Sequence, residues 1–419
     1  MIVPPTCRMK RFVLGLSVAA SLWMVATAVS AGPDALPRSD PSSVGLSATR
    51  LDEATELLRR HVAEKKVAGV VAAVARRGKL AYLEAAGVQD LEARTPMTDR
   101  SIFRIYSMTK AVTAAAAMML WEQGRFRLDD PVSKYLPEFK SVTVLASETG
   151  STRPPSRDIT IQDLMLHTSG LNHRTSDIYR RAQVRSRSLA LPRFVADIVR
   201  VPLMEDPGTR YRYSESTTVL GRLIEIWSGR PLDEFLRERV FGPLAMVDTG
   251  FWVSPEQRNR LATVYTGQTG ALGPIELEAV PFTERPALLE GAVGLVSTVP
   301  DYLRFCQMLL SRGTLDGTRL LRGETVDMMT VNRLPDPFVK SRRGQLGWGL
   351  GNVEIVTDPG ALDYGASRGE YGWNGSAGTI FWVDPALEMV TIVMTQSSPA
   401  NPDSLWQRFK TLVHGSIVR

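Results

Sequence analysis

The chain has 419 residues, of which 44% are hydrophobic and 22% charged, and this composition excludes a disordered or fibrous protein. Because 419 residues exceed one typical hydrophobic core, we expect a large α/β unit with an inserted lobe, or two domains. The formal charge of +6 falls to +3 without residues 1–31, which is too small to indicate nucleic acid as a partner.

The N-terminal segment differs in kind from the rest of the chain. Three basic residues precede an uncharged stretch, 12–26, and small residues follow up to Ala31. This order is typical of a secretory signal peptide over residues 1–31, and the uncharged stretch is shorter than the roughly 20 residues of a membrane-spanning helix. We expect cleavage after Ala31 and a periplasmic or secreted protein with no stable membrane insertion. An uncleaved anchor is the alternative.

Cysteine and histidine are scarce, which limits metal and redox chemistry. Cys306 is the only cysteine outside the signal segment, so a disulfide framework and a cysteine-rich metal site are excluded. It lies in an apolar helical pattern, 302–310, where we expect a buried and inert thiol. The histidines show no H-E-x-x-H spacing and no phosphate-binding glycine loop is present, so we expect neither a metal nor an organic cofactor.

The first elements after the signal segment are a helix and a hairpin. Apolar residues recur at helical spacing up to Ala63, which predicts an amphipathic helix capped by Ser47. Two apolar runs, 67–75 and 80–86, flank a polar turn and predict a β-hairpin. The stretch 109–121 is apolar on nearly every face and indicates a helix inside the core.

The middle and the end of the chain complete the predicted fold. Helical patterns separated by Pro and Gly predict a mostly helical lobe; they cover residues 161–166, 191–201, 217–228 and 232–240. Two strands, 379–383 and 389–395, precede a last helix at about 402–414. We therefore predict an α/β fold in which an antiparallel sheet flanked by helices is built from both chain ends. The predicted division is an α/β domain of residues 32–124 and 285–419 and an inserted helical domain of residues 125–284.

Ser107 and Lys110 stand at the predicted start of the core helix, where residues three apart share one face. A serine hydroxyl is a poor nucleophile without an adjacent base, and a lysine amine is such a base when burial lowers its pKa from about 10.4. The spacing alone is common, and a helix cap followed by a surface lysine is the alternative. The uncharged run 111–121 favours function, because a lysine that enters an apolar core needs a reason.

Further stretches of the chain form an ordered set with the segment around Ser107: 124–132 (GRFRLDDPV), 159–171 (ITIQDLMLHTSGL), 207–214 (PGTRYRYS), 294–298 (GLVST) and 372–378 (GWNGSAG). In this order they resemble the serine β-lactamase-related family, which includes class C-like β-lactamases and penicillin-binding proteins. The nearest resemblance is to the family VIII carboxylesterases. It runs from about residue 45 to about residue 415, and it implies a β-lactamase-like fold with Ser107 as the nucleophile.

The second motif of that family, Tyr-x-Asn, is matched at one position and altered at the other. The resemblance implies that Tyr213 shares the proton transfer with Lys110, by relaying the serine proton or by protonating the leaving group. A phenol does so only where nearby cations favour its anion. Glu215 stands in the place of the asparagine, and a carboxylate cannot both donate and accept as an amide does. Glu215 therefore argues against β-lactam specificity.

The third family motif, Lys-Thr-Gly, aligns with Trp373-Asn374-Gly375, and family VIII esterases resemble this chain in having the tryptophan. Trp373 has no charge to pair with the carboxylate of a penicillin or a peptide terminus. Gly375 allows its strand to approach the substrate closely. By the same resemblance, the backbone N–H groups of Ser107 and Ser376 form the oxyanion hole. For the tripeptide alone, an edge strand that packs an aromatic side chain is the alternative.

Three other groups of residues are weaker candidates for a site. Ser367 lies in a G-x-S-x-G pattern, but that pattern requires a strand before it and a helix after it, and the flanking sequence indicates a loop that leads into a strand. His167 and Ser169 indicate a turn after a helix rather than a catalytic pair. A basic stretch is expected to be a solvated rim, with attraction of an anionic substrate or surface as the alternative; it contains Arg180, Arg181, Arg185 and Arg187.

The sequence thus predicts an exported serine hydrolase that cleaves small carboxylic esters through an acyl-enzyme on Ser107, without a nucleic acid partner. A β-lactamase, a D-Ala-D-Ala carboxypeptidase or a D-aminopeptidase of the same superfamily is the first alternative. A non-catalytic cell-wall binding module is the second, although a scaffold has no physical need for Ser107, Lys110 and Tyr213 together. The natural substrate and the oligomeric state do not follow from the sequence.

Overall fold

A computed structural model of the chain describes residues 1–2, 36–147, 150–267, 271–341, 345–362 and 364–418. The predicted signal segment lies outside these residues apart from its first two, so cleavage and export stay predictions. No helix in the described ranges has both the length and the apolar character needed to cross a membrane.

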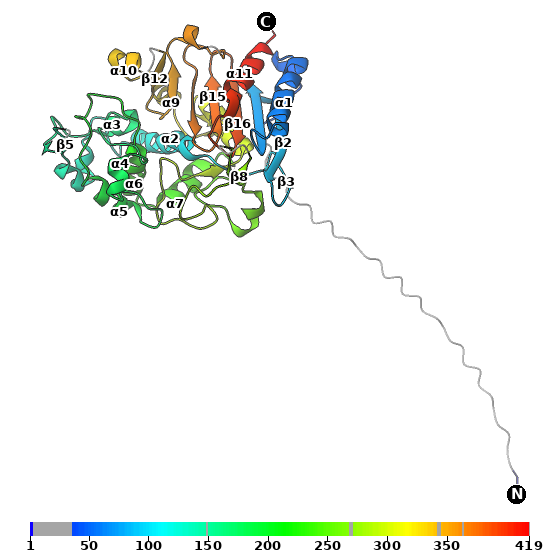
Figure 1. Cartoon of the computed structure of the whole chain (residues 1–419), viewed down its shortest axis with the longest axis horizontal. Helices are drawn as coiled ribbons and strands as arrows, with labels where there is room; N and C mark the ends of the chain where they lie inside the picture. Colours follow the sequence, from blue (N-terminus) through cyan, green and yellow to red (C-terminus); the bar gives the residue numbers. More distant parts are fainter. Residues whose placement is uncertain (3–35, 148–149, 268–270, 342–344, 363, 419) are drawn as a thin grey trace. The chain divides into compact units, whose positions relative to one another are not determined.

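An eight-stranded antiparallel sheet is assembled from both ends of the described chain (Figure 1). β1 pairs with β2 on one side and with β16, more than 300 positions later in the sequence, on the other. The strand order is β12-β13-β14-β15-β16-β1-β2-β3. Its strands are β1 (Gly69–Arg76), β2 (Lys79–Asp90), β3 (Thr95–Pro96), β12 (Leu346–Trp348), β13 (Glu354–Val356), β14 (Tyr371–Gly375), β15 (Thr379–Asp384) and β16 (Met389–Thr395).

The central strand β1 is apolar at nearly every position because both of its faces are covered. All eight of its residues are buried. Side chains alternate between the faces of a strand, so Val70, Ala72 and Val74 join one apolar cluster while Val71 and Ala73 join another. The predicted hairpin is confirmed, and this alternation explains why its first strand has no polar face.

Different helices cover the two faces of the sheet. α1 (Ala48–Ala63) and α11 (Leu405–Gly415) pack against each other and share the cluster of Val70, Ala72 and Val74. The hydroxyl of Ser47 accepts a hydrogen bond from the Arg50 N–H at 3.4 Å, which confirms the predicted cap of α1. α8 (Val299–Leu310) packs on β16 and β1, and α2 (Thr109–Glu122) belongs to the cluster on that side.

The middle of the chain is mostly helical, as predicted, but one helix is wrong in detail. Residues 232–240 do not form one α-helix: α7 (Leu232–Leu236) continues as a π-helical turn (Arg237–Phe241), which ends where the Gly242 N–H donates to the Arg237 carbonyl at 2.8 Å. The other helices are α3 (Ile161–Leu166), α4 (Asp177–Arg181), α5 (Leu191–Ile198), α6 (Ser216–Ser228), α9 (Gly323–Met329) and α10 (Asp336–Ser341).

Short strands outside the large sheet tie loops together. β4 (Phe103–Arg104) pairs with β9 (Val296–Ser297), next to the segment that carries Ser107. The remaining short strands are β5 (Val144–Leu145) with β6 (Thr152–Arg153), β10 (Thr314–Leu315) with β11 (Thr318–Arg319), and β17 (Ser397–Ser398) with β7 (Tyr265–Thr266) and β8 (Gly273–Pro274).

α2 is the helix that joins the sheet to the middle of the chain. All of its residues from Thr109 to Leu120 are buried, and it packs against α6. A single apolar cluster contains α2, α6 and the inner residues of β1. The α/β fold with an antiparallel sheet is confirmed, while the division at residues 124/125 and 284/285 stays a prediction.

Candidate active site

Ser107 lies in a short turn directly before α2. The helix begins at Thr109, as predicted, and Ser107 belongs to a 3₁₀ turn, Tyr106–Met108, that leads into it. Tyr106 has a φ of 39°, in the left-handed region that strains a bulky side chain. The hydroxyl of Tyr302 donates to the Met108 carbonyl at 2.9 Å. The backbone of this turn is therefore tied to α8, and the Ser107 hydroxyl that it carries is partly exposed.

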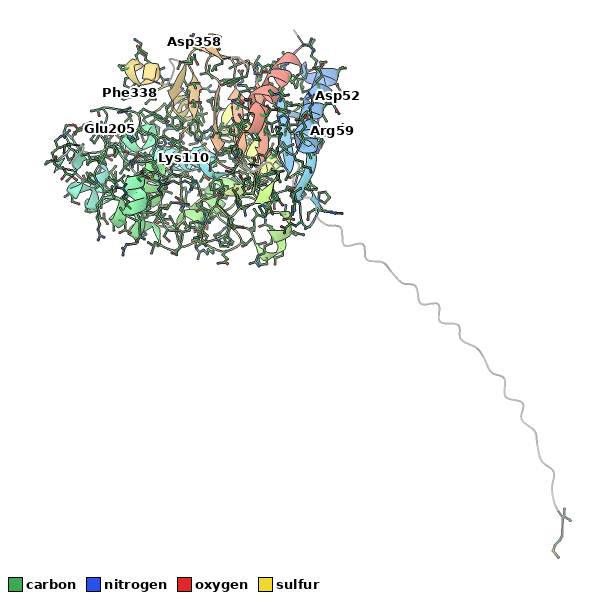
Figure 2. All side chains as sticks on the ribbon, viewed as in Figure 1. Asp52, Arg59, Lys110, Glu205, Phe338 and Asp358 are labelled. Carbon is green, nitrogen blue, oxygen red and sulfur yellow. The ribbon has the colours of Figure 1, made fainter. Side chains whose placement is uncertain are left out.

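Lys110 is a buried lysine whose contacts do not include a carboxylate. It is 1% exposed, and Figure 2 marks its place on α2. Its Nζ donates to the Ala292 carbonyl at 3.0 Å and lies 3.5 Å from Ser107 Oγ. No carboxylate of the described residues forms a salt bridge with it. The amine is therefore desolvated beside a hydroxyl, and a 3.5 Å separation is one that substrate binding tightens in many enzymes.

Tyr213 completes the cluster from the segment before α6. Lys110 Nζ lies 4.6 Å from the centre of the Tyr213 ring. Trp373 on β14 donates its Nε1–H to the Tyr213 hydroxyl at 3.0 Å. The structure thus brings together Ser107, Lys110, Tyr213 and Trp373, which are far apart in the sequence.

Aromatic side chains and two histidines surround Tyr213, and the ring centre of His167 lies 4.8 Å from that of Tyr213. Trp348 packs edge-on to Trp373 with ring centres 4.7 Å apart, and His173 stacks on Tyr213 at 5.7 Å. Burial, together with the positive charges of Lys110 and Arg174, lowers the pKa of His173 to about 4. His173 is therefore neutral at physiological pH and adds no charge to the site.

The end of β14 reaches the turn that carries Ser107. A Cβ atom on Gly375 would lie 2.3 Å from the Ile105 carbonyl oxygen, so only glycine permits this approach. The close contact predicted for Gly375 is thus with the protein backbone. Among the described residues, neither the Ser107 N–H nor the Ser376 N–H donates to a protein acceptor. Both donors are available for an oxyanion, while Asn374 is partly exposed on the same strand.

Glu215 does not lie where a substrate could reach it, which corrects its predicted place in the substrate-binding wall. It is 1% exposed, and its carboxylate accepts a hydrogen bond from Thr218 Oγ1 at 2.7 Å. Burial and the nearby carboxylate of Glu290 raise the pKa of Glu215, although Lys110 opposes that shift. Glu215 forms no salt bridge with Lys110 in the part of the chain that the structure describes.

Several residues that complete the site were not identified from the sequence. The Ala292 carbonyl, which accepts from Lys110, lies just before the stretch 294–298 that carries part of the family resemblance. Glu290 is fully buried, and Arg185 donates to both of its oxygens at 2.6 and 2.8 Å. Nothing in the sequence marked Trp348 or His173 as site residues, because a lone aromatic residue or histidine usually serves packing.

The structure excludes the three weaker candidates, Ser367, His167 and Ser169, from the roles that were considered for them. Ser367 lies in the loop before β14 with no helix after it, so the α/β-hydrolase elbow is excluded. His167 ends α3 in the left-handed conformation, as the predicted turn requires. Its Nδ1 lies 3.2 Å from Ser214 Oγ, whereas Ser169 Oγ lies 2.8 Å from Ser216 Oγ, so they do not form a pair.

Two further expectations have different outcomes. Burial raises the pKa of Cys306 well above its usual value, which confirms an inert thiol. The prediction that the basic stretch is a solvated rim is wrong for two of its four arginines. Arg187 is 3% exposed and packs over the Phe282 ring at 4.1 Å, and Arg185 is held by buried Glu290.

One cluster in the described residues could hold a metal by its chemistry. One ligand atom each from Glu370, Asp384 and His414 lie within 4.8 Å of one another. Lys410 donates to Glu370, however, and brings a positive charge into this cluster. The amine offsets the carboxylate charge that a metal ion would otherwise balance.

The sequence and the fold match known proteins over most of the chain. The Beta-lactamase family profile matches residues 54–411. Protein Rv1367c of Mycobacterium tuberculosis is 36% identical over 352 residues, which cover 80% of this chain and 86% of that protein. Esterase EstB of Burkholderia gladioli is 29% identical over 388 residues, 86% of this chain and 94% of that enzyme.

Among solved structures, EstCE1, a hydrolase with promiscuous acyltransferase activity, superposes with a TM-score of 0.77. It is 24% identical, covers 88% of this chain and 99% of its own, and supports the fold alone. The family profile spans the strand-and-helix framework that holds Ser107, Lys110, Tyr213 and Trp373. The chain therefore belongs to the Beta-lactamase family of serine hydrolases.

Proposed function

We propose that this protein is an exported carboxylesterase that forms an acyl-enzyme on Ser107. The observation that carries the proposal is the desolvated amine of Lys110, which lies 3.5 Å from Ser107 Oγ and has no carboxylate partner among the described residues. A buried amine without an anionic partner is costly for folding, and serving as a base gives it a reason to be there.

In the first half of the reaction, Ser107 Oγ attacks the ester carbonyl carbon while the amine of Lys110 accepts the hydroxyl proton. Negative charge develops on the carbonyl oxygen, and the Ser107 and Ser376 N–H groups are placed to donate to it. Tyr213, next to Lys110, passes a proton to the departing alcohol.

In the second half, water attacks the acyl carbonyl of Ser107. Lys110 and Tyr213 take one proton from this water and return it to Ser107 Oγ, which leaves as a hydroxyl when its bond to the acyl carbon breaks and the carboxylic acid departs. The same groups serve both halves, so no further base is needed. Trp373 positions Tyr213, because its N–H donates to the phenolic oxygen and leaves the Tyr213 proton directed elsewhere.

The choice of ester over lactam rests chiefly on Trp373. A tryptophan on β14 has no charge for the carboxylate of a penicillin, whereas its ring suits the apolar part of an ester. The burial of Glu215 weakens the second reason drawn from the sequence, since a buried carboxylate neither reads nor rejects a side chain. The name of the relative Esterase EstB agrees with ester cleavage.

A β-lactamase or peptidase of the same family is the second candidate, because the same acyl-enzyme chemistry opens a lactam or an amide. Rates on p-nitrophenyl butyrate and nitrocefin separate the two. We expect the ester to be the better substrate by kcat/KM, and a clear preference for nitrocefin would overturn the ester proposal.

Covalent labelling tests the nucleophile itself. A fluorophosphonate probe should label the purified protein, and peptide mapping should place the adduct on Ser107. The matched variants are Ser107→Ala, which should lose labelling, and Ser367→Ala, which should keep it. An adduct on Ser367 refutes the proposed nucleophile, and no adduct at all favours the non-catalytic module. Export is tested by finding a mature chain that begins at Gly32 in the periplasmic or secreted fraction.

A further inference from the structure

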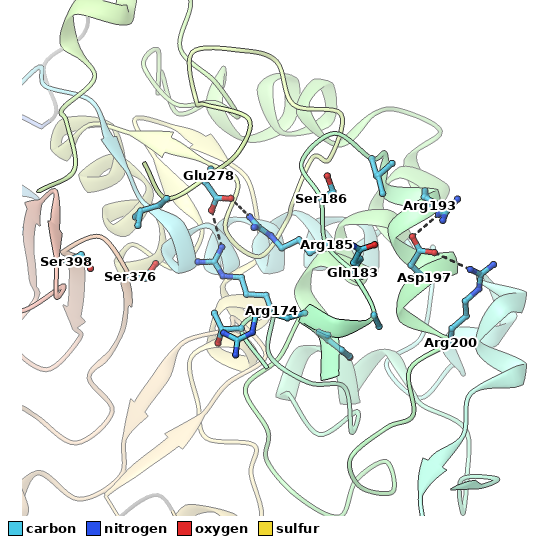
Figure 3. Close-up of a pocket in the computed structure, with 16 residues that line it drawn as sticks. Arg174, Gln183, Arg185, Ser186, Arg193, Asp197, Arg200, Glu278, Ser376 and Ser398 are labelled. Atoms are coloured by element: carbon cyan, nitrogen blue, oxygen red, sulfur yellow. Dashed lines mark hydrogen bonds and ion pairs between the residues drawn. The ribbon is translucent and has the colours of Figure 1, made fainter. Parts of the chain in front are cut away.

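A cavity of about 940 Å³ opens beside the proposed oxyanion hole (Figure 3). Ser376, which follows β14, and Ser398 on β17 line one end of it. α4 and α5 supply much of the other end, where Arg193, Asp197 and Arg200 lie in Figure 3. The cavity therefore runs from the proposed reaction centre towards the helical middle of the chain.

Positive charge dominates the described wall of this cavity. Five arginines line it, against two acidic residues, Asp197 and Glu278; the arginines are Arg174, Arg180, Arg185, Arg193 and Arg200. The formal charge of these lining groups is thus +3. The basic stretch noticed in the sequence supplies two of them, and chain folding adds the other three.

Internal ion pairs offset part of this charge but not all of it. Behind the wall, Asp177 pairs with Arg180, and Glu290 accepts from Arg185 at 2.6 and 2.8 Å, so the five arginines and their four carboxylates leave a net charge of +1. The two acidic residues of the wall are each shared between two arginines. Glu278 lies 3.3 Å from Arg174 and 2.9 Å from Arg185, and Asp197 lies 2.7 Å from Arg193 and 3.5 Å from Arg200. Two guanidinium groups together offer about ten N–H donors, whereas one carboxylate accepts about four hydrogen bonds. Shared acceptors hold the guanidinium groups in place and leave donors for a further anion.

The arginine nearest to the reacting groups is well placed for this role. Arg174 lies over the ring of Tyr106, 5.4 Å from its centre, and Tyr106 directly precedes Ser107. Its side chain is only 14% exposed and is held by Glu278, so it is ordered before any ligand arrives. Preordered guanidinium groups bind carboxylates with two parallel hydrogen bonds, which lysine cannot do.

We propose that this cavity, the arginine pocket, binds a carboxylate carried by the ester, so that the enzyme prefers esters of dicarboxylic acids over neutral esters. The inference rests on the proposed esterase function and adds a substrate class to it. The scissile carbonyl lies at Ser107 and Ser376, and the far carboxylate of the acyl chain extends into the arginine pocket.

The first experiment compares matched pairs of substrates. Mono-p-nitrophenyl adipate and sebacate are tested against p-nitrophenyl hexanoate and decanoate, which have the same chain length without the second carboxylate. We expect kcat/KM for at least one half-ester to exceed that for its neutral partner by about 10-fold or more, as a charge-assisted hydrogen bond provides. Raising NaCl from about 50 mM to about 500 mM should reduce this ratio, because exposed charges are screened. Equal or lower rates for both half-esters overturn the inference.

Variants then tie the preference to the pocket. Arg174→Gln and Arg180→Gln should each lower the half-ester to neutral-ester ratio several-fold, largely through KM. Arg180 is 64% exposed, so its variant tests the pocket even if Arg174→Gln folds poorly. Arg181→Gln is the matched control, since Arg181 follows Arg180 on α4 but does not line the cavity. A ratio that falls equally in Arg181→Gln would show a general charge effect and refute the pocket.

These outcomes separate the inference from the function on which it rests. Suppose that Ser107 is labelled and neutral esters are hydrolysed, but the half-esters are not hydrolysed faster than their neutral partners. The esterase proposal is then supported and the arginine pocket is refuted. If Ser107→Ala hydrolyses both kinds of ester as the wild type does, the proposed acyl-enzyme on Ser107 is refuted, and the inference that rests on it is refuted as well.

Discussion

Two lysines in this protein are equally buried and yet lie in opposite surroundings. Lys110 and Lys410 are each 1% exposed. Lys110 touches a serine hydroxyl, a backbone carbonyl and the Tyr213 ring. Lys410 donates to the Glu370 carboxylate and lies between the rings of Tyr364 and Trp382, at 4.8 and 4.9 Å from their centres. Both amines lie against aromatic rings, but only Lys410 has a carboxylate partner among the described residues.

The carboxylate decides what each amine can do. An amine that donates to a buried carboxylate, as Lys410 does to Glu370, serves the fold. An amine that contacts the hydroxyl of Ser107 and no carboxylate is placed to accept the proton of Ser107 during the reaction. The region around Lys110 is therefore arranged for proton transfer, and the region around Lys410 for cohesion of β14, β15 and α11.

The largest expected effect is the loss of catalysis around Lys110. Ser107→Ala and Lys110→Met should each lower kcat/KM on p-nitrophenyl butyrate by at least about 1,000-fold, because nucleophile and base act as a unit. The thermal midpoint should hold or rise in Lys110→Met, since a buried amine without a carboxylate partner is replaced by an apolar chain of similar length. A Lys110→Met enzyme with near wild-type kcat/KM would contradict the base role.

Lys410→Met is the matched variant, and it should affect stability instead. It leaves the Glu370 carboxylate buried without its partner, which costs about 3–5 kcal/mol of unfolding free energy. Urea denaturation followed by circular dichroism measures the loss, and kcat/KM of the folded protein should stay near the wild-type value. The double variant Glu370→Gln/Lys410→Met should recover much of the stability. If Lys410→Met unfolds at the wild-type urea concentration, the pair does not support the fold.

Two tryptophans on neighbouring strands extend the same contrast to smaller effects. Trp373→Phe keeps an aromatic ring beside Trp348 but removes the N–H that donates to Tyr213, and we expect kcat/KM to fall about 10-fold. Trp382→Phe alters the ring beside Lys410 and should leave kcat/KM unchanged. Steady-state kinetics on p-nitrophenyl butyrate measures both. Equal losses in the two variants would mean that packing, and not the hydrogen bond to Tyr213, explains the effect.

The same contrast shows how much could be predicted from the sequence. Ser107 and Lys110 are three positions apart, so local spacing and an apolar run suggested the pair, and the family resemblance then favoured it. Tyr213 and Trp373 were found through family motifs, and their mutual hydrogen bond was not foreseen. The group formed by Glu370, Asp384 and Lys410 could not be predicted, because the three residues come from separate segments that only the folded sheet brings together.

Where the sequence misled, long-range packing was the cause. Glu215 was placed at the substrate by its motif position, but the N-terminus of α6 turns it towards Thr218 and Glu290. Arg185 and Arg187 were expected on a solvated rim, because an arginine-rich stretch gives no sign of the buried Glu290 and Phe282 that hold them. The hairpin of β1 and β2 and the pair of β15 and β16, by contrast, follow from apolar runs that the sequence shows directly.

The smallest expected effect concerns the histidine beside each lysine. Burial and the neighbouring lysine lower the pKa of His173, next to Lys110, and of His414, next to Lys410, to about 4 from the usual 6.5. Between pH 6.5 and 4 the unfolded chain binds protons that the folded chain does not, so these groups make stability fall as the pH falls. His173→Gln and His414→Gln should each reduce this fall relative to the wild type in urea denaturation.

Only one of the two histidines touches the reacting groups, which makes activity the sharper readout. Because His173 is already neutral above about pH 5, His173→Gln should change the size of kcat/KM, through its stacking on Tyr213, and leave the shape of its pH profile from 5 to 8 intact. His414→Gln should change neither. A change in kcat/KM near pH 6.5 that is seen in the wild type and lost in His173→Gln would show that this histidine titrates in the working enzyme. Proton transfer would then involve His173 as well as Lys110 and Tyr213.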